Sequence, residues 1–413
     1  MALADELRDD VLERFLRYVR IDTQSDRDST TYPSTARQLD LSRLLLGELK
    51  GLGLDDAELT EHGYVFATLP GEPNTPTVGL LAHVDVSPDA PAEGVKPQVH
   101  ADYDGESELV PGLAPANSPL LAERKGHDIV TSDGTTLLGA DDKAGVAEIM
   151  AAAAYLKRHP EIPHANTRIA FTVDEEIGHG TDHFDLERFG ADFAYTLDGS
   201  VVGEVEAETW SALELKVTFR GVPVHPGYAK DILVNPVKLA ARFVASFPPD
   251  HAPETTEGRQ GFLHPLSIAG NAEGVTVVCY VRDFDWDGVL AGEALLRKLA
   301  EEAIAGEPRA SVDYERWEQY RNMKEKLDER PEVIEAALEA ARRAGLEPKI
   351  TSIRGGTDGS RLTEMGLPTP NLFTGGNEYH SVKEWISVQD LALSAATAVE
   401  LLKLLAEPQW RSA

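Results

Sequence analysis

Cysteine is nearly absent from the sequence, which has only Cys279 among its 413 residues. A single cysteine cannot form an intramolecular disulfide bond, and it excludes a zinc site built from several thiolates. Cys279 alternates with Val275, Val277 and Val281 along a predicted strand, so the four side chains share one face. We therefore expect Cys279 in a hydrophobic core and not as a nucleophile.

Basic residues are scarce as well, because 39 lysines and arginines stand against 70 acids and give a formal charge of −31. Such a surface repels the phosphates of nucleic acids and of anionic membranes. Long apolar runs are also lacking, since none approaches the ~18–20 residues that span a bilayer. The first ten residues, MALADELRDD, are acidic and show no signal-peptide pattern. We expect a cytoplasmic protein with no nucleic-acid or membrane partner.

The sequence instead has short apolar runs that alternate with helical segments. The runs end in Gly, Asp, Glu or His, as in TVGLLAHVD, RIAFTVDEE, FAYTLDG and TPNLFTGGNEYH. Helical segments such as AGVAEIMAAAAYLKRH lie between them. Buried strands that alternate with helices predict an α/β fold, in which a mostly parallel sheet has helices on both faces.

The middle of the chain has a different pattern, with half-buried strands and amphipathic helices. In order, its segments are ALELKVTFRG, NPVKLAARFVASF, GVTVVCYVRDF, DGVLAGEALLRKLAEEAI and RASVDYERW. This order predicts an inserted ferredoxin-like α+β domain. We place this lid domain at residues 209–320, between the two parts of a catalytic domain at 1–208 and 321–413.

Side chains that commonly bind metals lie at or just beyond the ends of the predicted strands, where open α/β sheets place their sites. They are His83 and Asp85, Asp141 and Asp142, Glu175 and Glu176, Asp198, and His380. Consecutive acids at the end of a buried strand, as in TVDEEIG, repel one another unless a cation neutralises them. This pattern predicts a metal site.

The ligand types and their number indicate which metals fit. Histidine and carboxylate ligands without thiolates suit Zn, Co or Mn. These side chains come from five places in the sequence, each of which offers at least one ligand. A catalytic zinc normally keeps three protein ligands, so five ligand positions exceed the need of one ion. They fit two ions that share a carboxylate. The spacing of His83 and Asp85 also suits a carboxylate that accepts the far N–H of a metal-bound imidazole.

Each motif alone also has a purely structural interpretation. The acids of GADDKAG can cap a helix, and those of VDEEIG can form a solvated turn. Their joint occurrence at the strand ends of one sheet favours the metal site. The sequence has no G-x-S-x-G nucleophile motif, no P-loop and no G-x-G-x-x-G motif.

Several longer motifs resemble those of a known family. They are HVDVSPDAP, GADDKAG, VDEEIGHG, TLDG, VHPGYAKDILVNP, RDFD, RGGTDGSRL and GGNEYHSVKE, and they span nearly the whole chain. In this order they resemble the di-zinc exopeptidases and deacylases, a family of metallopeptidases. SPDAP, HPGYAK and RDFD resemble more narrowly its tripeptide aminopeptidase branch.

The resemblance implies two zinc ions per subunit, with cobalt or manganese as alternatives. Asp141 would bridge the ions. His83 and Asp198 would complete one site, and Glu176 and His380 the other.

The resemblance also implies roles for residues that do not bind metal. Glu175 would be the general base, and Asp85 would orient His83. In the lid, His225 would help to hold the tetrahedral intermediate, and Arg282 would bind the substrate carboxylate. Lys230 and Arg354 are further candidates for that carboxylate, because a lid cation at a fixed reach would measure peptide length.

The expected activity is release of the N-terminal residue from tripeptides, and the resemblance implies a homodimer formed through the lid. The alternatives within the fold are an N-acyl amino acid deacylase, a carboxypeptidase or a dipeptidase. A protein that binds metal without catalysis is the alternative of another class. The presence of Glu175 argues against it, because a pure binding site needs no uncoordinated base.

Overall fold

The computed structural model describes residues 2–410, which divide into two compact units. The first unit contains the residues up to Ala207, Met323–Ser352 and the residues from Thr357 onward. The second contains Glu208–Asn322 and Ile353–Gly356. The segment Ile353–Gly356, which lies outside the predicted lid range of 209–320, belongs to the second unit.

The first unit is built on an eight-stranded sheet. In spatial order its strands are β1 (Glu58–Leu59), β2 (Val65–Leu69), β6 (Asn166–Thr172), β3 (Thr77–His83), β7 (Phe193–Gly199), β14 (Asn371–Phe373), β8 (Glu204–Thr209) and β13 (Lys349–Ile353). The central strands β6, β3, β7 and β14 are parallel, and β1, β2 and β8 pair antiparallel at the sides. Apolar side chains fill the central strands, as expected for strands that are buried on both faces.

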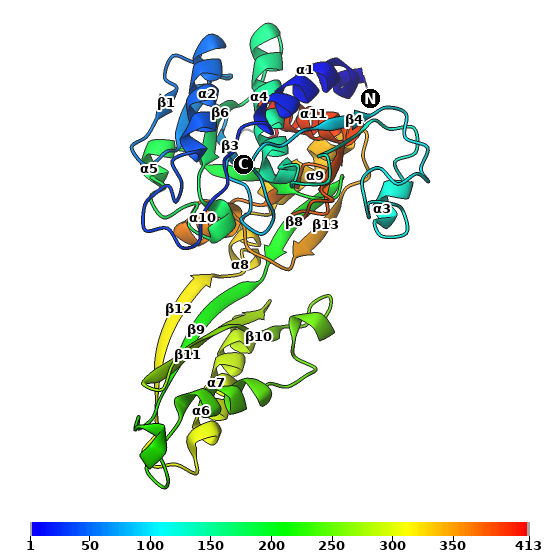
Figure 1. Cartoon of the computed structure of the whole chain (residues 1–413). Helices are drawn as coiled ribbons and strands as arrows, with labels where there is room; N and C mark the ends of the chain where they lie inside the picture. Colours follow the sequence, from blue (N-terminus) through cyan, green and yellow to red (C-terminus); the bar gives the residue numbers. More distant parts are fainter. Residues whose placement is uncertain (1, 411–413) are drawn as a thin grey trace. The chain divides into compact units, whose positions relative to one another are not determined.

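Helices cover this sheet (Figure 1). Helix α4 (Ala140–Arg158) packs on β3 and β7, and α1 (Ala2–Tyr18) and α11 (Val388–Leu405) pack on α4. Helix α2 (Gln38–Gly51) packs on β1 and β2, and α10 (Asp358–Met365) packs on β7. The remaining helices of the unit are α3 (Pro119–Ala122), α5 (Leu186–Phe189), α8 (Lys324–Leu327) and α9 (Pro331–Arg343). The predicted α/β fold with a mostly parallel central sheet is confirmed.

A small antiparallel sheet lies in the same unit. Its strands are β15 (Gly376–Asn377), β16 (Trp385–Ser387), β5 (Ile129–Thr131) and β4 (Gln98–His100). The indole of Trp385 is fully buried in an apolar cluster with Tyr103, Leu113 and Leu121. This sheet anchors the segment before α4 through β5, and the segments on either side of His380 through β15 and β16.

The second unit is a four-stranded antiparallel sheet with helices α6 (Pro236–Ala245) and α7 (Trp286–Ile304) packed on it. Its strands, in spatial order, are β10 (Phe262–Gly270), β11 (Gly274–Asp283), β9 (Ser211–Arg220) and β12 (Ser311–Tyr320). The chain order and the strand order together are those of the ferredoxin-like fold, as predicted. Cys279 is fully buried in the core of this unit, and this prediction is also confirmed.

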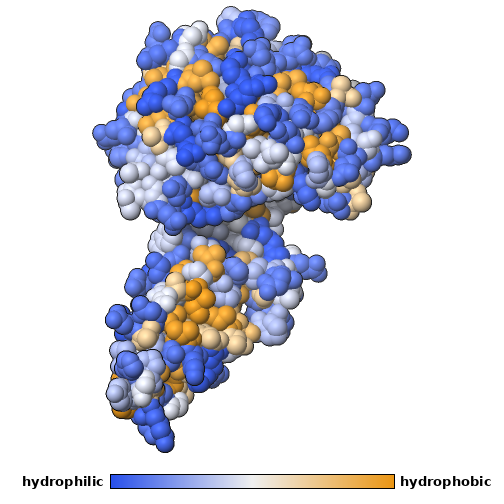
Figure 2. All heavy atoms as spheres, viewed as in Figure 1, coloured by the Kyte–Doolittle hydropathy of each residue, from blue (hydrophilic) through white to orange (hydrophobic). Residues whose placement is uncertain are grey.

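Several apolar side chains are exposed to solvent on the surface of the second unit (Figure 2). Exposed large apolar residues of this unit include Leu266 and Ile268 on the edge strand β10, and Val237 and Leu290 on its helices. Within residues 2–410, no helix is long and apolar enough to cross a bilayer.

Candidate metal centre

The candidate ligands of the first unit come from separate elements that end close together. His83 is the last residue of β3, and Asp198 is the penultimate residue of β7. Glu175 and Glu176 form the short 3-10 turn η1 (Glu175–Ile177) just after β6. Because β3, β6 and β7 are parallel, their carboxyl ends meet at one edge of the sheet.

The acids of GADDKAG reach the same edge from the first turn of α4, which begins at Ala140. A Cβ atom at Gly145 would lie 1.9 Å from the carbonyl oxygen of Leu197. Glycine at this position therefore allows α4 to approach the end of β7. This close approach brings Asp141 and Asp142 to Asp198.

One half of the centre surrounds the buried imidazole of His83. Its Nε2 atom lies 3.0 Å from Oδ1 of Asp141 and 3.5 Å from Oδ1 of Asp198. Its Nδ1 atom, on the opposite side of the ring, lies 3.1 Å from the carbonyl oxygen of Asp85 and 3.4 Å from Oδ1 of the same residue. The ring therefore presents one nitrogen to a pair of acids and the other to Asp85.

The other half surrounds His380, which follows β15. Its Nε2 atom lies 2.9 Å from Oε2 of Glu176 and 3.3 Å from Oδ2 of Asp141. The two carboxylate oxygens of Asp141 thus face two different histidines. This is the arrangement expected of a carboxylate shared by two metal ions.

Asp85 is fully buried and connects the two halves through the backbone. Its carboxylate accepts hydrogen bonds from the N–H groups of Glu175 and Glu176, at 3.0 and 3.2 Å. It therefore fixes the turn that carries both glutamates as well as facing His83. The neighbouring Asp174 has a local role, because it accepts hydrogen bonds from Ser34 and Gln38.

Asp142 is the alternative to Asp141 as a ligand, since His83, Asp142 and Asp198 also form a group that could hold a metal. The second such group within residues 2–410 is His83, Asp141 and Glu176. The carboxylate oxygens of Asp142 each accept a backbone hydrogen bond, from His83 at 3.1 Å and from Gly145 at 3.2 Å. We favour Asp141, because its oxygens instead face the two histidine rings.

The electrostatics of the cluster indicate a cation site. Burial raises the pKa of Glu176 to about 8, and the charge of Asp141 adds to the effect. Burial likewise raises the pKa of Asp198 to about 6. The Oε1 atom of Glu176 is buried and has no hydrogen-bond partner among the described residues. A divalent cation would compensate for both the repulsion between these acids and this unpaired oxygen, so the residues fit a metal centre.

Glu175 lies beside the cluster, with Oε2 3.9 Å from Nε2 of His83. Burial raises its pKa well above the ordinary value, and the positive charge of His83 opposes this shift. A carboxylate with a raised pKa accepts a proton more readily at neutral pH than a solvated one does.

Sequence reasoning missed two residues that position the ligands. The buried carboxylate of Glu384 accepts hydrogen bonds from the N–H groups of Leu138, Gly139 and Asp141. The side-chain oxygen of Asn371 accepts one from the N–H of Asp198. Glu384 follows His380 by four residues within GGNEYHSVKE, so the motif contained it, but its role depends on backbone groups that are remote in sequence.

The lid candidates all belong to the second unit. His225 and Lys230 are exposed. The largely buried guanidinium group of Arg282 donates to the carbonyl oxygens of Leu213 and Val281 and to the side chain of Gln319.

Arg354 donates to the carbonyl and the hydroxyl group of Thr256, and its guanidinium group lies over the ring of Trp210. Both lid arginines therefore have partners inside the second unit. Their contact with substrate stays a prediction.

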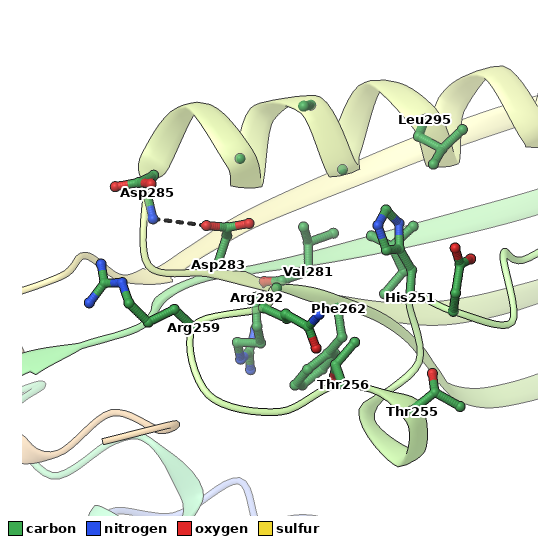
Figure 3. Close-up of a pocket in the computed structure, with 17 residues that line it drawn as sticks. His251, Thr255, Thr256, Arg259, Phe262, Val281, Arg282, Asp283, Asp285 and Leu295 are labelled. Atoms are coloured by element: carbon green, nitrogen blue, oxygen red, sulfur yellow. Dashed lines mark hydrogen bonds between the residues drawn. The ribbon is translucent and has the colours of Figure 1, made fainter. Parts of the chain in front are cut away.

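The second unit also has a cavity of about 760 Å³ (Figure 3). It lies between the start of α7 and the loop before β10, with Asp283, Asp285 and His251 on its wall. Neither candidate metal group found within residues 2–410 includes a residue of this cavity. Both candidate metal groups of the described residues therefore lie in the first unit.

Comparisons with known proteins identify the family of the chain. The model of peptidase family M20/M25/M40 matches residues 131–404. A protein of Geobacillus sp. (strain WCH70) named peptidase T is 46% identical over 405 residues, which cover 96% of this chain and 99% of that protein.

Solved structures are similar along almost the full chain. Aminopeptidase PepT from Bacillus cereus ATCC 10987 has a TM-score of 0.74 at 23% identity, covering 97% of this chain and 99% of its own. A tripeptidase from Staphylococcus aureus has a TM-score of 0.77 at 23% identity, covering 97% and 98%. These likenesses show a shared fold. Together with the family match and the relative of 46% identity, they confirm the resemblance read from the motifs: the chain belongs to peptidase family M20/M25/M40.

Proposed function

We propose that the protein is a two-metal aminopeptidase that releases the N-terminal residue of tripeptides. The observation that carries the proposal is the carboxylate of Asp141, whose oxygens face His83 on one side and His380 on the other, at 3.0 and 3.3 Å. The relatives named peptidase T and the structural neighbour described as a tripeptidase support this substrate class.

The proposed ligand set follows from these contacts. His83 and Asp198 hold one ion, Glu176 and His380 hold the other, and Asp141 joins them. We propose zinc as the metal, because imidazole and carboxylate ligands suit it and an open position remains for substrate.

Bound divalent ions supply two chemical effects, since they lower the pKa of water from about 15.7 to about 7 and polarise a carbonyl group. Glu175 accepts the proton of the attacking water and delivers it to the leaving amine. Its neighbour Asp85 keeps the turn of Glu175 in place through the two backbone hydrogen bonds. General-base catalysis of this kind contributes ~10²–10⁴ in rate.

We propose that the lid selects substrates by their length. Arg282 binds the C-terminal carboxylate of the peptide, Lys230 and Arg354 are the further candidates, and His225 helps to hold the tetrahedral intermediate. A cation at a fixed distance from the metals favours tripeptides, because a dipeptide does not reach it and a longer peptide overshoots it.

We further propose a cytoplasmic homodimer. The edge strand β10 offers unpaired backbone groups, and its exposed Leu266 and Ile268 suit a surface that a second copy covers. A monomer in sedimentation experiments at micromolar concentration contradicts this part of the proposal.

The test is hydrolysis of tri-alanine, di-alanine, tetra-alanine and N-acetyl-tri-alanine, with products followed by chromatography. Each peptide is incubated with metal-stripped protein and with protein restored with zinc or cobalt. Metal-dependent release of free alanine from the tripeptide, and not from the acetylated peptide, is the expected result. Cleavage of the acetylated peptide would make the protein a deacylase, and activity in the metal-stripped protein would refute the metal centre.

A further inference from the structure

In the half of the metal centre that contains the exposed His380, a further carboxylate, that of Asp89, lies next to the histidine ring. The Nδ1 atom of His380 lies 3.3 Å from Oδ2 of Asp89, on the ring side opposite Glu176 and Asp141. Asp89 belongs to HVDVSPDAP, the same motif that contributes His83 and Asp85. One short segment therefore reaches both histidines of the centre.

Asp89 is itself held by a second residue. Nη1 of Arg27, from the loop between α1 and α2, donates to Oδ1 of Asp89 at 2.6 Å. The backbone N–H of Asp89 also donates to the hydroxyl group of Ser87. Arg27 thus occupies one carboxylate oxygen and leaves the other facing His380.

The two histidines differ in how much the fold constrains them. The His83 side chain is 2% exposed and has the fully buried Asp85 behind it, whereas that of His380 is 40% exposed. His380 also has a left-handed backbone with a φ of 60°, which non-glycine residues seldom adopt. Because little packing surrounds its ring, contacts made by the ring itself must set its orientation.

We propose that Asp89, anchored by Arg27, is the positioning residue of the His380 metal site. A carboxylate that accepts the Nδ1–H of a metal-binding histidine fixes the tautomer, so that the Nε2 lone pair faces the metal. Asp89 performs for the exposed site the task that Asp85 performs for the buried one. This inference rests on the proposed metal centre and assigns a role to the SPDAP part of the motif.

The test is metal binding by Asp89→Ala, measured by equilibrium dialysis with zinc and by the absorption spectrum during cobalt titration. Loss of such a partner typically weakens metal binding 10- to 100-fold, so we expect about that change at one of the two sites. The other site, at His83, should keep its cobalt affinity and its absorption spectrum. Asp40→Asn, which breaks the exposed ion pair between Asp40 and Arg43, is the matched control and should bind both ions normally.

A second background separates positioning from a general loss of negative charge. In His380→Ala the ring is gone, so adding Asp89→Ala should change the remaining zinc affinity no further. An equal loss at both sites, an equal loss in the His380→Ala background, or no loss at all would each overturn the inference.

The outcome for wild-type protein distinguishes this inference from the proposed function. Wild-type protein that binds no zinc contradicts the proposed function itself. Wild-type protein that binds two ions, together with an Asp89→Ala variant that binds both equally well, contradicts only the role of Asp89.

Discussion

The two units of the protein use their charged residues in opposite ways. In the first unit, acids from β7, α4 and η1 converge on two histidines, and burial raises the pKa of several of them. In the second unit, Arg282 and Arg354 instead find their partners among carbonyl and side-chain oxygens of that unit. Such satisfied cations stabilise a fold, whereas converging acids destabilise it unless a cation binds.

The comparison teaches where function can be read directly from geometry. Mutual repulsion among buried carboxylates has no structural benefit, so it points to a ligand. The hydrogen bonds of an arginine to internal acceptors already account for its position in the fold. A further role in substrate binding therefore has to be separated from its structural role by experiment.

The largest effect is expected for Asp141→Asn in the first unit. Its two carboxylate oxygens serve both halves of the centre, so we expect the bound metal to fall from two ions to fewer than one and peptidase activity to become undetectable. Elemental analysis after dialysis measures the loss. Asp142→Asn is the neighbouring control, and a larger metal loss in that variant would reverse the assignment of the bridging residue.

Glu175→Gln is expected to lower kcat by about 10²–10⁴ because it removes the base. It should retain both ions, since Glu175 is not among the proposed ligands. Steady-state kinetics with a tripeptide, combined with metal analysis, tests both statements. Near-normal turnover would refute the assignment of the general base.

Arg282→Ala tests whether Arg282 of the second unit binds substrate or only stabilises the fold. If Arg282 binds the substrate carboxylate, KM for the tripeptide rises by about 10- to 100-fold, which corresponds to a charged hydrogen bond of about 1.5–3 kcal/mol. The preference for tripeptides over tetrapeptides should then weaken.

Arg316→Ala is the matched control for this prediction. Arg316 is another arginine of the lid sheet with internal partners, Glu293 and Glu318, but it is not a substrate candidate. An unchanged length profile in Arg282→Ala, with a loss of thermal stability alone, would assign Arg282 to the fold.

A separate effect, on folding and not on catalysis, is expected in the pH dependence of stability. Burial raises the pKa of Glu206 to about 8 in the folded protein, against about 4.3 for a solvated glutamate. The folded protein therefore binds the proton of Glu206 more tightly than the unfolded chain does. The stability that this proton contributes is fully present below about pH 4.3 and is lost as the pH rises toward 8. Glu206→Gln keeps an acceptor for the amide of Asn371, its partner in the wild type.

Urea unfolding of the metal-free protein at pH 5 and pH 8 measures this effect. The difference in unfolding midpoint between the two pH values should be smaller in Glu206→Gln than in the wild type. An equal difference in both proteins would mean that Glu206 does not titrate in this range.

Much of the first unit was predictable, because the candidate ligands directly follow the apolar runs that form its strands. Apolar runs that close in His83, Glu176 or Asp198 show both the strand and the side chain at its end. Once the sheet is known to be parallel, the meeting of these residues follows. Three of the four lid strands were predictable for a similar reason, since alternation showed them and their buried faces. Strand β10 was not identified from the sequence, because its side chains from Ser267 to Gly270 are all exposed and do not alternate.

The positioning contacts were not predictable, because they join side chains to groups far away in the sequence. Glu384 binds backbone N–H groups near residue 140, and Asp89 binds His380 across most of the chain. The internal partners of Arg282 depend on the register of β9 against β11, which no pattern of residue types fixes. Motifs can therefore indicate ligands, but they do not reveal what holds them.

The central claim is that Asp141 joins two metal sites in the first unit. Anomalous X-ray diffraction at the zinc edge, from crystals of the zinc-loaded protein, tests it most directly. We predict two zinc peaks about 3.5–4 Å apart, one beside His83 and the other beside His380, with Asp141 between them. A single peak, or two peaks that Asp141 does not contact, would contradict the account.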